Sequence, residues 1–115
     1  MKLLIADDNI EMREMLKSIY NQYFIEIIEC SDGDEAVKAF TSFKPDWVFM
    51  DIKMSRMDGI KATEEIVKKF PEAKIIIVSQ YNDEDTIQSA LKSGAFQFVN
   101  KDNLLAIEDI IKESF

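Results

Sequence analysis

The sequence predicts an α/β fold in which five parallel strands alternate with five helices. Five short apolar runs have the length of strands, and the segments between them repeat their apolar residues with the period of a helix. Three of the runs are almost continuously apolar, as expected for strands covered on both faces of a parallel sheet. The runs are residues 3–6, 25–28, 47–50, 75–78 and 96–99. Repeated β–α alternation implies right-handed crossovers and a sheet that lies between two layers of helices.

The helices are indicated by their capping residues, their apolar stripes and the residues that end them. Asn9 is a suitable N-cap for the first helix, whose apolar residues recur three and four positions apart. Acidic residues 83–85 suit the N-terminus of the fourth helix, and Gly94 suits its end. We expect the second to fifth helices over about 33–43 (after Ser31 or Asp32), from Asp58 to Pro71, from 83–85 to Gly94, and over about 103–114. Periodicity does not predict the order of the strands.

Composition predicts one domain and excludes several kinds of site. Residues 1–115 are expected to form a single domain, because domains of about 100–150 residues are the most common. The chain has no His, which excludes a Ser-His-Asp triad, a His-ligated zinc or haem, and a phosphohistidine on this chain. The single cysteine, Cys30, cannot form an internal disulfide, and it follows an apolar run. We therefore expect it to be a buried, unreactive thiol.

Charge and hydropathy indicate where the protein is located and which partners it does not bind. It has 14 Lys and Arg against 22 Asp and Glu, and this net charge of −8 repels the phosphates of nucleic acids. No apolar stretch approaches the roughly 20 residues that cross a bilayer, and the N-terminal apolar run is too short for a signal peptide. We therefore expect a soluble protein of the reducing cytoplasm that binds neither nucleic acid nor a membrane directly.

Functional residues are expected where the strands end, because open parallel sheets bind ligands beyond the carboxyl ends of their strands. The polar residues at these positions are Asp7, Asp8, Asp51, Ser79 and Lys101. Converging carboxylates repel one another unless a cation lies among them, and oxygen ligands without His or Cys favour Mg²⁺. Such a site supports phosphoryl transfer, with Asp51 as the nucleophile and Lys101 and Ser79 stabilising the transferred charge.

These residues lie in motifs that resemble the receiver domain of two-component response regulators. The similar stretches are residues 5–9, 44–46, 50–60, 78–79 and 94–101, and together they extend over essentially the whole chain. The resemblance implies a flavodoxin-like fold with strand order 2-1-3-4-5. It also implies that Asp51 accepts a phosphoryl group from the phosphohistidine of a sensor histidine kinase or phosphotransfer protein. The chain would then catalyse its own phosphorylation and slow dephosphorylation, without being a conventional enzyme.

The same resemblance implies a role for each site residue. The implied ligands of Mg²⁺ are Asp7, Asp8, Asp51 and the backbone carbonyl of Lys53. Ser79 and Phe98 resemble the switch pair of the family, in which the hydroxyl moves toward the phosphoryl group and the ring turns inward. This movement alters the face made by the fourth helix, the fifth strand and the fifth helix. We expect that face to control a partner, a transcriptional output domain or a homodimer.

Two loops beside the site depart from the family pattern. Ser55 stands where the family usually has Pro, and the loss of that constraint loosens the loop after Asp51. Asp102 follows Lys101 in place of a second Pro. The Lys101–Asp102 peptide is therefore expected to be either trans with a rerouted loop, or strained and held by its surroundings.

A third departure affects access to the phosphoryl pocket. Gln80 replaces a residue that is usually small, and we expect it to narrow the pocket together with Lys53 and Tyr81, which lie two residues beyond Asp51 and Ser79. These departures leave open a second function, that of a pseudo-receiver that binds other proteins without being phosphorylated.

Two enzyme classes fit the sequence less well. A phosphatase of the haloacid-dehalogenase type requires a second Asp two residues after the nucleophile, and this chain has Lys53 there. A flavodoxin holds phosphate in the loop after its first strand, where Asp7 and Asp8 would repel it.

Overall fold

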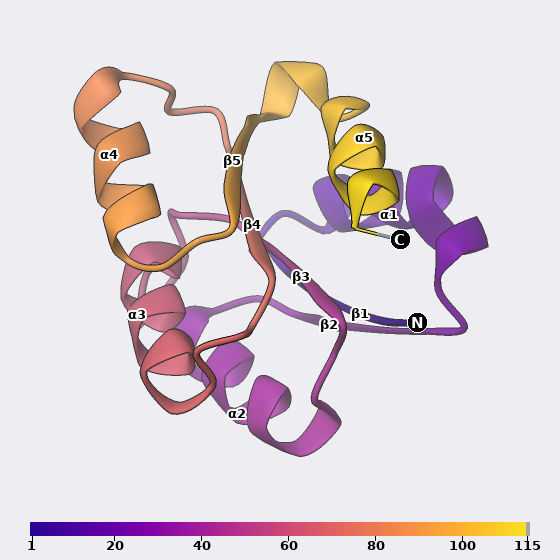
Figure 1. Cartoon of the computed structure of the whole chain (residues 1–115), viewed down its shortest axis with the longest axis horizontal. Coiled ribbons are helices and arrows are strands. Elements are labelled where there is room, and N and C mark those ends of the chain that lie inside the picture. The colour runs from indigo at the N-terminus through magenta and orange to yellow at the C-terminus, as the bar shows by residue number, and fades with distance from the viewer. Residues whose placement is uncertain (115) are drawn as a thin grey trace.

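The computed structural model describes residues 1–114 and contains one five-stranded parallel sheet, in the order β2-β1-β3-β4-β5 (Figure 1). The strands are β1 (Lys2–Ala6), β2 (Glu26–Cys30), β3 (Trp47–Met50), β4 (Ile75–Ser79) and β5 (Gln97–Asn100). The helices are α1 (Ile10–Tyr20), α2 (Gly33–Phe43), α3 (Gly59–Lys69), α4 (Glu84–Lys92) and α5 (Ala106–Glu113), with short 3₁₀ turns η1 (Asn21–Tyr23) and η2 (Lys101–Asn103). The predicted fold class and strand order are confirmed.

The sheet lies between two helical layers, because successive residues of its strands point to opposite faces (Figure 1). Leu3 and Ile5 of β1 belong to the core shared with α1 and α5, whereas Leu4 and Ala6 belong to the core shared with α2, α3 and α4. The Tyr20 hydroxyl of α1 donates a 2.6 Å hydrogen bond to the carbonyl oxygen of Leu104, just before α5. Both faces of the central strands are therefore buried, as their continuous apolar sequences predict.

Helices α1 to α4 begin where the sequence predicts, because polar side chains cap their first turns, whereas α5 begins at Ala106 and not at about 103. Asn9, Asp32, Asp58 and Asp83 each accept a hydrogen bond from a backbone N–H three residues further on. These caps fix the N-termini of α1 to α4 at the edge of the sheet where the strands end. In residues 1–114, none of the helices has the length and apolarity needed to cross a bilayer.

Several predicted boundaries differ from the structure by one to three residues: β1 begins one residue earlier, at Lys2, and β4 ends one residue later, at Ser79. β2 begins one residue later than predicted and continues to Cys30, because its backbone pairs with β1 up to Ala6 opposite Cys30. Ile25, predicted as its first residue, is 87% exposed. β5 is likewise displaced by one residue, from 96–99 to 97–100. The predicted helix at 103–114 is preceded by η2, because the Asn100 side chain accepts a hydrogen bond from the Asp102 N–H and closes a 3₁₀ turn.

Candidate functional site

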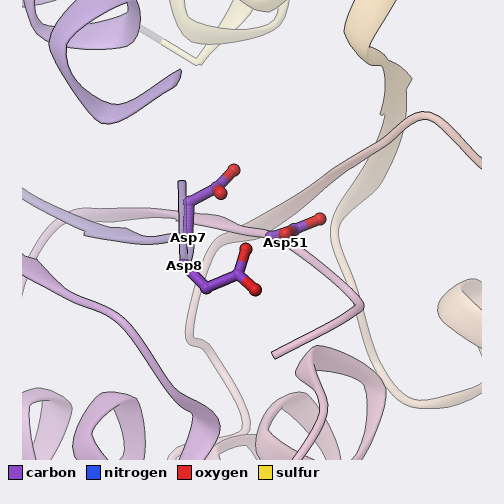
Figure 2. Close-up of side chains that lie close together, drawn as sticks. All are labelled: Asp7, Asp8 and Asp51. Atoms are coloured by element: carbon purple, nitrogen blue, oxygen red, sulfur yellow. The ribbon is translucent and has the colours of Figure 1, made fainter. Parts of the chain in front are cut away.

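Three carboxylates meet at the edge of the sheet where β1 and β3 end (Figure 2). Ligand oxygens of Asp7, Asp8 and Asp51 all lie within 4.8 Å of one another. Asp7 and Asp51 are buried, whereas Asp8 is exposed. The cluster is thus built into the protein on one side and open to solvent on the other, which suits a cation that enters from solvent.

Backbone pairing fixes two of these residues. The Asp7 N–H donates to the carbonyl oxygen of Cys30, and the Asp51 N–H donates to the carbonyl oxygen of Ala6, at 3.1 and 2.8 Å. Their side chains are oriented by the loops that follow, because Asp7 Oδ1 accepts from the Asn9 N–H and Asp51 Oδ1 accepts from the Ile52 N–H, both at 2.9 Å. The convergence predicted from the sequence therefore follows from the ladder between adjacent parallel strands.

Lys101 completes the charged cluster. Its Nζ lies 3.2 Å from Asp7 Oδ2 and 3.3 Å from Asp51 Oδ1. The Lys101–Asp102 peptide is trans, so the first of the two predicted alternatives is correct. The 3₁₀ turn η2 carries the chain away from the site at this point, where the family usually has proline.

The charges at the site shift the pKa of two groups. Burial, and after it the charge of Asp7, raises the pKa of Asp51 to about 6, although Lys101 opposes the shift. Burial by itself lowers the pKa of Lys101, but the charges of Asp51 and Asp7 outweigh burial and raise it. One ammonium group thus only partly compensates three carboxylates, and a hard divalent cation suits the remaining oxygen ligands.

The three residues predicted to narrow access, Lys53, Gln80 and Tyr81, line a cavity of about 230 Å³ above this cluster. Its walls include Asp8, Asp51, Lys53, Gln80, Tyr81 and Lys101. Lys53 Nζ lies 4.9 Å from the centre of the Tyr81 ring, a cation–π contact that joins the loops after β3 and β4. The sequence places these two residues near the pocket but does not predict their mutual contact.

The two residues of the expected switch pair lie on neighbouring strands. Ser79 ends β4, is fully buried, and its Oγ accepts a 3.0 Å hydrogen bond from the Tyr81 N–H. Phe98 lies on β5, opposite Ile77, and is partly buried against the core that contains α3 and α4. In this structure the Ser79 hydroxyl is therefore engaged with its own loop.

The loop between β3 and α3 is held against the start of α2. The Gly33 N–H donates to the carbonyl oxygen of Met57 at 2.9 Å, and Ser55 forms a single parallel bridge with Asp32. At the other end of the loop, the Gly59 N–H donates to the carbonyl oxygen of Ile52 at 2.8 Å. Contacts with α2 thus constrain the loop in which Ser55 replaces a proline.

Comparison with known proteins accounts for this arrangement. A family model described as "Response regulator receiver domain" matches residues 3–113. This chain belongs to the response regulator receiver family. It is 41% identical over 102 residues to "Chemotaxis protein CheY" of Listeria monocytogenes, covering 88% of this chain and 86% of that protein. It is 38% identical to the "Uncharacterized transcriptional regulatory protein YhcZ" of Bacillus subtilis, covering 89% of this chain but only 49% of that protein.

Solved receiver structures have the same fold. A chain of the CheX-CheY-BeF3-Mg²⁺ complex from Borrelia burgdorferi aligns with a TM-score of 0.90 at 28% identity, covering 99% of this chain and 89% of that chain. The response regulator domain of Thermotoga maritima CheB aligns with a TM-score of 0.88 at 29% identity, covering 98% and 94%. Membership of this family sets aside the phosphatase and flavodoxin alternatives.

Proposed function

We propose that this receiver domain is a phosphorylation-dependent switch in which Asp51 is the phosphoacceptor. The observation that carries the proposal is the position of the Asp51 carboxylate: it is buried at the end of β3, 3.3 Å from Lys101 Nζ, and grouped with Asp7 and Asp8 beneath an open cavity. No other carboxylate in residues 1–114 belongs to such a cluster of three.

The residues at the site divide the chemistry among them. Lys101 Nζ and the Ile52 N–H both contact Oδ1 of the Asp51 carboxylate. We assign the attack on phosphorus to Oδ2: a bond forms between Oδ2 and phosphorus while the phosphorus–nitrogen bond of the donor phosphohistidine breaks. Lys101 then neutralises charge on the phosphoryl oxygens, and the hydroxyl of Ser79 binds one of them.

The three carboxylates fit Mg²⁺, because they supply hard oxygen ligands on a surface that leaves room for water. Asp7, Asp8, Asp51 and the carbonyl of Lys53 would hold the ion, with Asp8 as the main ligand of the first two. When bound, Mg²⁺ supplies positive charge at the transferred phosphoryl group. Lys101 holds Asp7 and Asp51 in place on the other side of the cluster.

The donor histidine belongs to a partner, because this chain has none. We infer a cytoplasmic sensor histidine kinase or phosphotransfer protein as that partner. Phosphorylation would draw the Ser79 hydroxyl from the Tyr81 N–H and turn Phe98 inward, altering the face formed by α4, β5 and α5. Gln80 and the Lys53–Tyr81 contact would set how readily the donor and water reach Asp51.

The face formed by α4, β5 and α5 is also where we expect the signal to be passed on. Relatives of two kinds align with this chain: CheY proteins, of which it covers most, and transcriptional regulators, of which it covers about half. A single receiver domain over residues 1–115 is compatible with either. We propose that the α4-β5-α5 face binds a partner, an output domain that regulates transcription, or a second copy of the chain.

The test is phosphorylation by a small acyl phosphate donor with and without Mg²⁺, followed by intact-mass spectrometry. Wild type is expected to gain one phosphoryl group only with Mg²⁺, and Asp51→Asn none. Asp109→Asn, an exposed residue of α5, is the matched control and should be labelled like wild type. Unlabelled wild type, under conditions that label another receiver, would indicate the pseudo-receiver function instead.

A further inference from the structure

We propose that Arg13 is a positioning residue that fixes the acidic loop Asp7–Asn9 for Mg²⁺, and that Glu29 on β2 holds Arg13 in the orientation required. This inference rests on the proposed function of the carboxylate cluster. It assigns a role to two residues outside the cluster, neither of which contributes a side-chain ligand.

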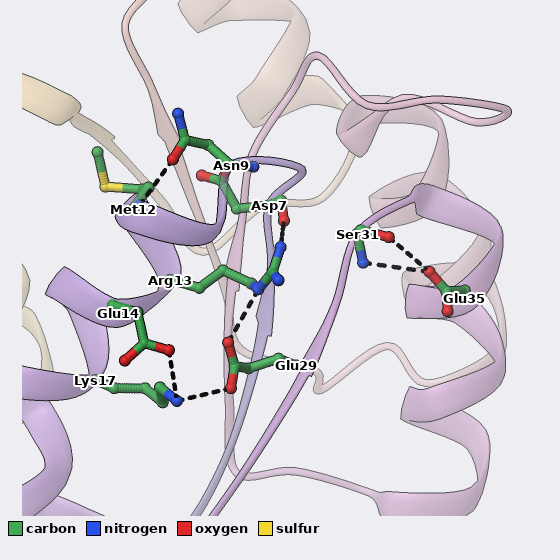
Figure 3. Close-up of polar contacts among 9 residues, drawn as sticks. All are labelled: Asp7, Asn9, Met12, Arg13, Glu14, Lys17, Glu29, Ser31 and Glu35. Carbon is green, nitrogen blue, oxygen red and sulfur yellow. Dashed lines mark hydrogen bonds and ion pairs between the residues drawn. The ribbon is translucent and has the colours of Figure 1, made fainter.

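Arg13 connects three elements with one side chain (Figure 3). From the first turn of α1, its Nη1 donates a 2.7 Å hydrogen bond to the backbone carbonyl oxygen of Asp7, just after β1. Its Nε donates a 2.9 Å hydrogen bond to Glu29 Oε1 on β2. The Arg13 side chain is only 16% exposed, so this geometry is supported by its surroundings as well as by the two bonds.

The backbone carbonyl of Asp7 lies just beyond the sheet, so no strand in residues 1–114 donates a hydrogen bond to it. The last register pair of β1 and β2 is Ala6 with Cys30, after which the chain turns toward α1. A backbone carbonyl at such a position requires another donor, and the guanidinium of Arg13 provides it. Because a peptide group is planar, fixing the Asp7 carbonyl also fixes the N–H of Asp8 and the direction in which Asp8 leaves the strand.

The remaining contacts of the loop close around the same residues. The Asn9 N–H donates to Asp7 Oδ1, and the Arg13 N–H donates to the Asn9 carbonyl oxygen in the first turn of α1. The Asn9 N–H therefore holds the side chain of Asp7, and the Arg13 guanidinium holds its backbone carbonyl. Asp8, between them, is exposed and depends on this frame for its position.

Glu29 is itself held by a second cation. Lys17, one turn further along α1, lies 2.9 Å from Glu29 Oε2, so each carboxylate oxygen has its own partner (Figure 3). The hydrogen bond from Lys17, with that from Arg13, outweighs burial and lowers the pKa of Glu29. Glu29 thus stays ionised and keeps Arg13 aligned over the neutral pH range.

Arginine is specifically required in this arrangement. Its planar guanidinium presents Nε and Nη1 in a fixed relation, which permits simultaneous bonds to Glu29 and to the Asp7 carbonyl. A lysine at position 13 would keep the charge but would have a single nitrogen for both acceptors. Arg13→Lys therefore separates the geometric role from the effect of the charge.

An effect of charge and an effect of loop position predict different changes in the affinity for Mg²⁺. If Arg13 acted only through its charge, Arg13→Gln would remove a nearby cation and tighten Mg²⁺ binding, and Arg13→Lys would change nothing. If Arg13 positions the loop, both variants weaken binding, by about tenfold as for other residues that orient metal ligands. Glu29→Gln is expected to weaken binding in the same direction by a smaller factor.

The experiment is calorimetric titration of each full-length protein with Mg²⁺ alone, accompanied by urea unfolding without Mg²⁺ to verify folding. Lys112→Gln is the matched control: it removes one positive charge and one ion pair, to Glu108, from the exposed face of α5. It is expected to bind Mg²⁺ as wild type does. Phosphorylation of Arg13→Lys at saturating Mg²⁺ should approach the wild-type rate, because excess ion compensates for lost affinity.

Each outcome decides between the two proposals. Weaker binding by Arg13→Lys and Arg13→Gln, with Lys112→Gln unchanged, supports the positioning role. Wild-type affinity in Arg13→Lys, or tighter binding in Arg13→Gln, overturns it while leaving the proposed function intact. Absence of Mg²⁺ binding by wild type would overturn the proposed function and this inference together. If Arg13→Gln fails to fold, Arg13→Lys still gives the decisive measurement, because it keeps the positive charge and loses only the geometry of the guanidinium.

Discussion

The start of α3 lies so close to the proposed phosphoacceptor that one added methyl group should destabilise the protein. A Cβ built on Gly59 would lie 1.8 Å from the carbonyl oxygen of Asp51 and 2.9 Å from Cγ of Met50. Non-bonded carbon–oxygen contacts are about 3.3 Å or longer, so the helix and strand β3 must separate by about 1.5 Å. The hydrogen bond from the Gly59 N–H to Ile52, now 2.8 Å long, would then be lost.

The expected cost of Gly59→Ala follows from these terms. The lost hydrogen bond contributes about 1 kcal/mol, and the forced displacement about 1–3 kcal/mol. The better helix propensity of alanine returns at most about 1 kcal/mol. We therefore expect the free energy of unfolding to fall by about 2 kcal/mol, which lowers the urea midpoint by about 1 M.

Urea unfolding can be followed by the fluorescence of Trp47, which is the single tryptophan and is 2% exposed. The control is Lys61→Ala, which changes an exposed side chain two residues further along α3. Its expected change in the free energy of unfolding is below about 0.5 kcal/mol. An unchanged midpoint for Gly59→Ala would refute the reasoning, because it would mean that α3 and the Asp51 peptide separate without measurable cost.

Two further predictions concern linked equilibria. Mg²⁺ at a hundred times its dissociation constant should raise the free energy of unfolding by about 2.7 kcal/mol and the melting temperature by several degrees, and Asp8→Asn should reduce this response in a thermal-shift titration. Burial raises the pKa of Tyr20 to about 12, from 10.0 in the unfolded chain. Because the folded-state pKa is the higher one, the contribution of the neutral phenol to stability is complete below pH 10 and is lost as the pH rises toward 12. The free energy of unfolding, obtained from urea unfolding at each pH, should fall by about 2–3 kcal/mol over this range in wild type. Tyr20→Phe should not show this fall.

Each of these predictions has an outcome that would contradict it. A melting temperature that does not move across the Mg²⁺ titration would argue against a cation site among the carboxylates. Equal alkaline sensitivity of wild type and Tyr20→Phe would show that the phenol does not carry the pH dependence. Tyr20→Phe should also cost about 1–2 kcal/mol at neutral pH, because the buried carbonyl of Leu104 loses its donor.

The sequence predicts most of the fold and the members of the candidate site, because both depend on local patterns. Apolar runs and capping residues indicate each element, and parallel strands bring Asp7 and Asp51 to one edge. The ends of β2 were not predicted, because backbone pairing on an edge strand continues through Glu29 and Cys30 after the apolar pattern stops. Cys30 is buried, as expected, and burial raises the pKa of its thiol to about 12.

Contacts between side chains far apart in the chain were beyond the reach of these patterns. The bonds of Arg13 to Glu29 and to the Asp7 carbonyl depend on how α1 lies across β1 and β2. The position of Lys53 over the ring of Tyr81 likewise depends on the heights of two loops above the sheet. For the Lys101–Asp102 peptide the sequence permitted two conformations, and a local hydrogen bond to Asn100 accompanies the one observed.

The attachment of the β3–α3 loop to α2 has a consequence for how the protein opens locally. The Gly33 N–H reaches Met57, and Ser55 bridges to Asp32, so this loop shares its hydrogen bonds with the first turn of α2. Segments that share hydrogen bonds tend to open as one cooperative unit. The amide protons of the loop should therefore exchange with solvent together with those at the start of α2. A proline would restrict this loop through its own ring, whereas here the restriction comes from hydrogen bonds between the loop and α2.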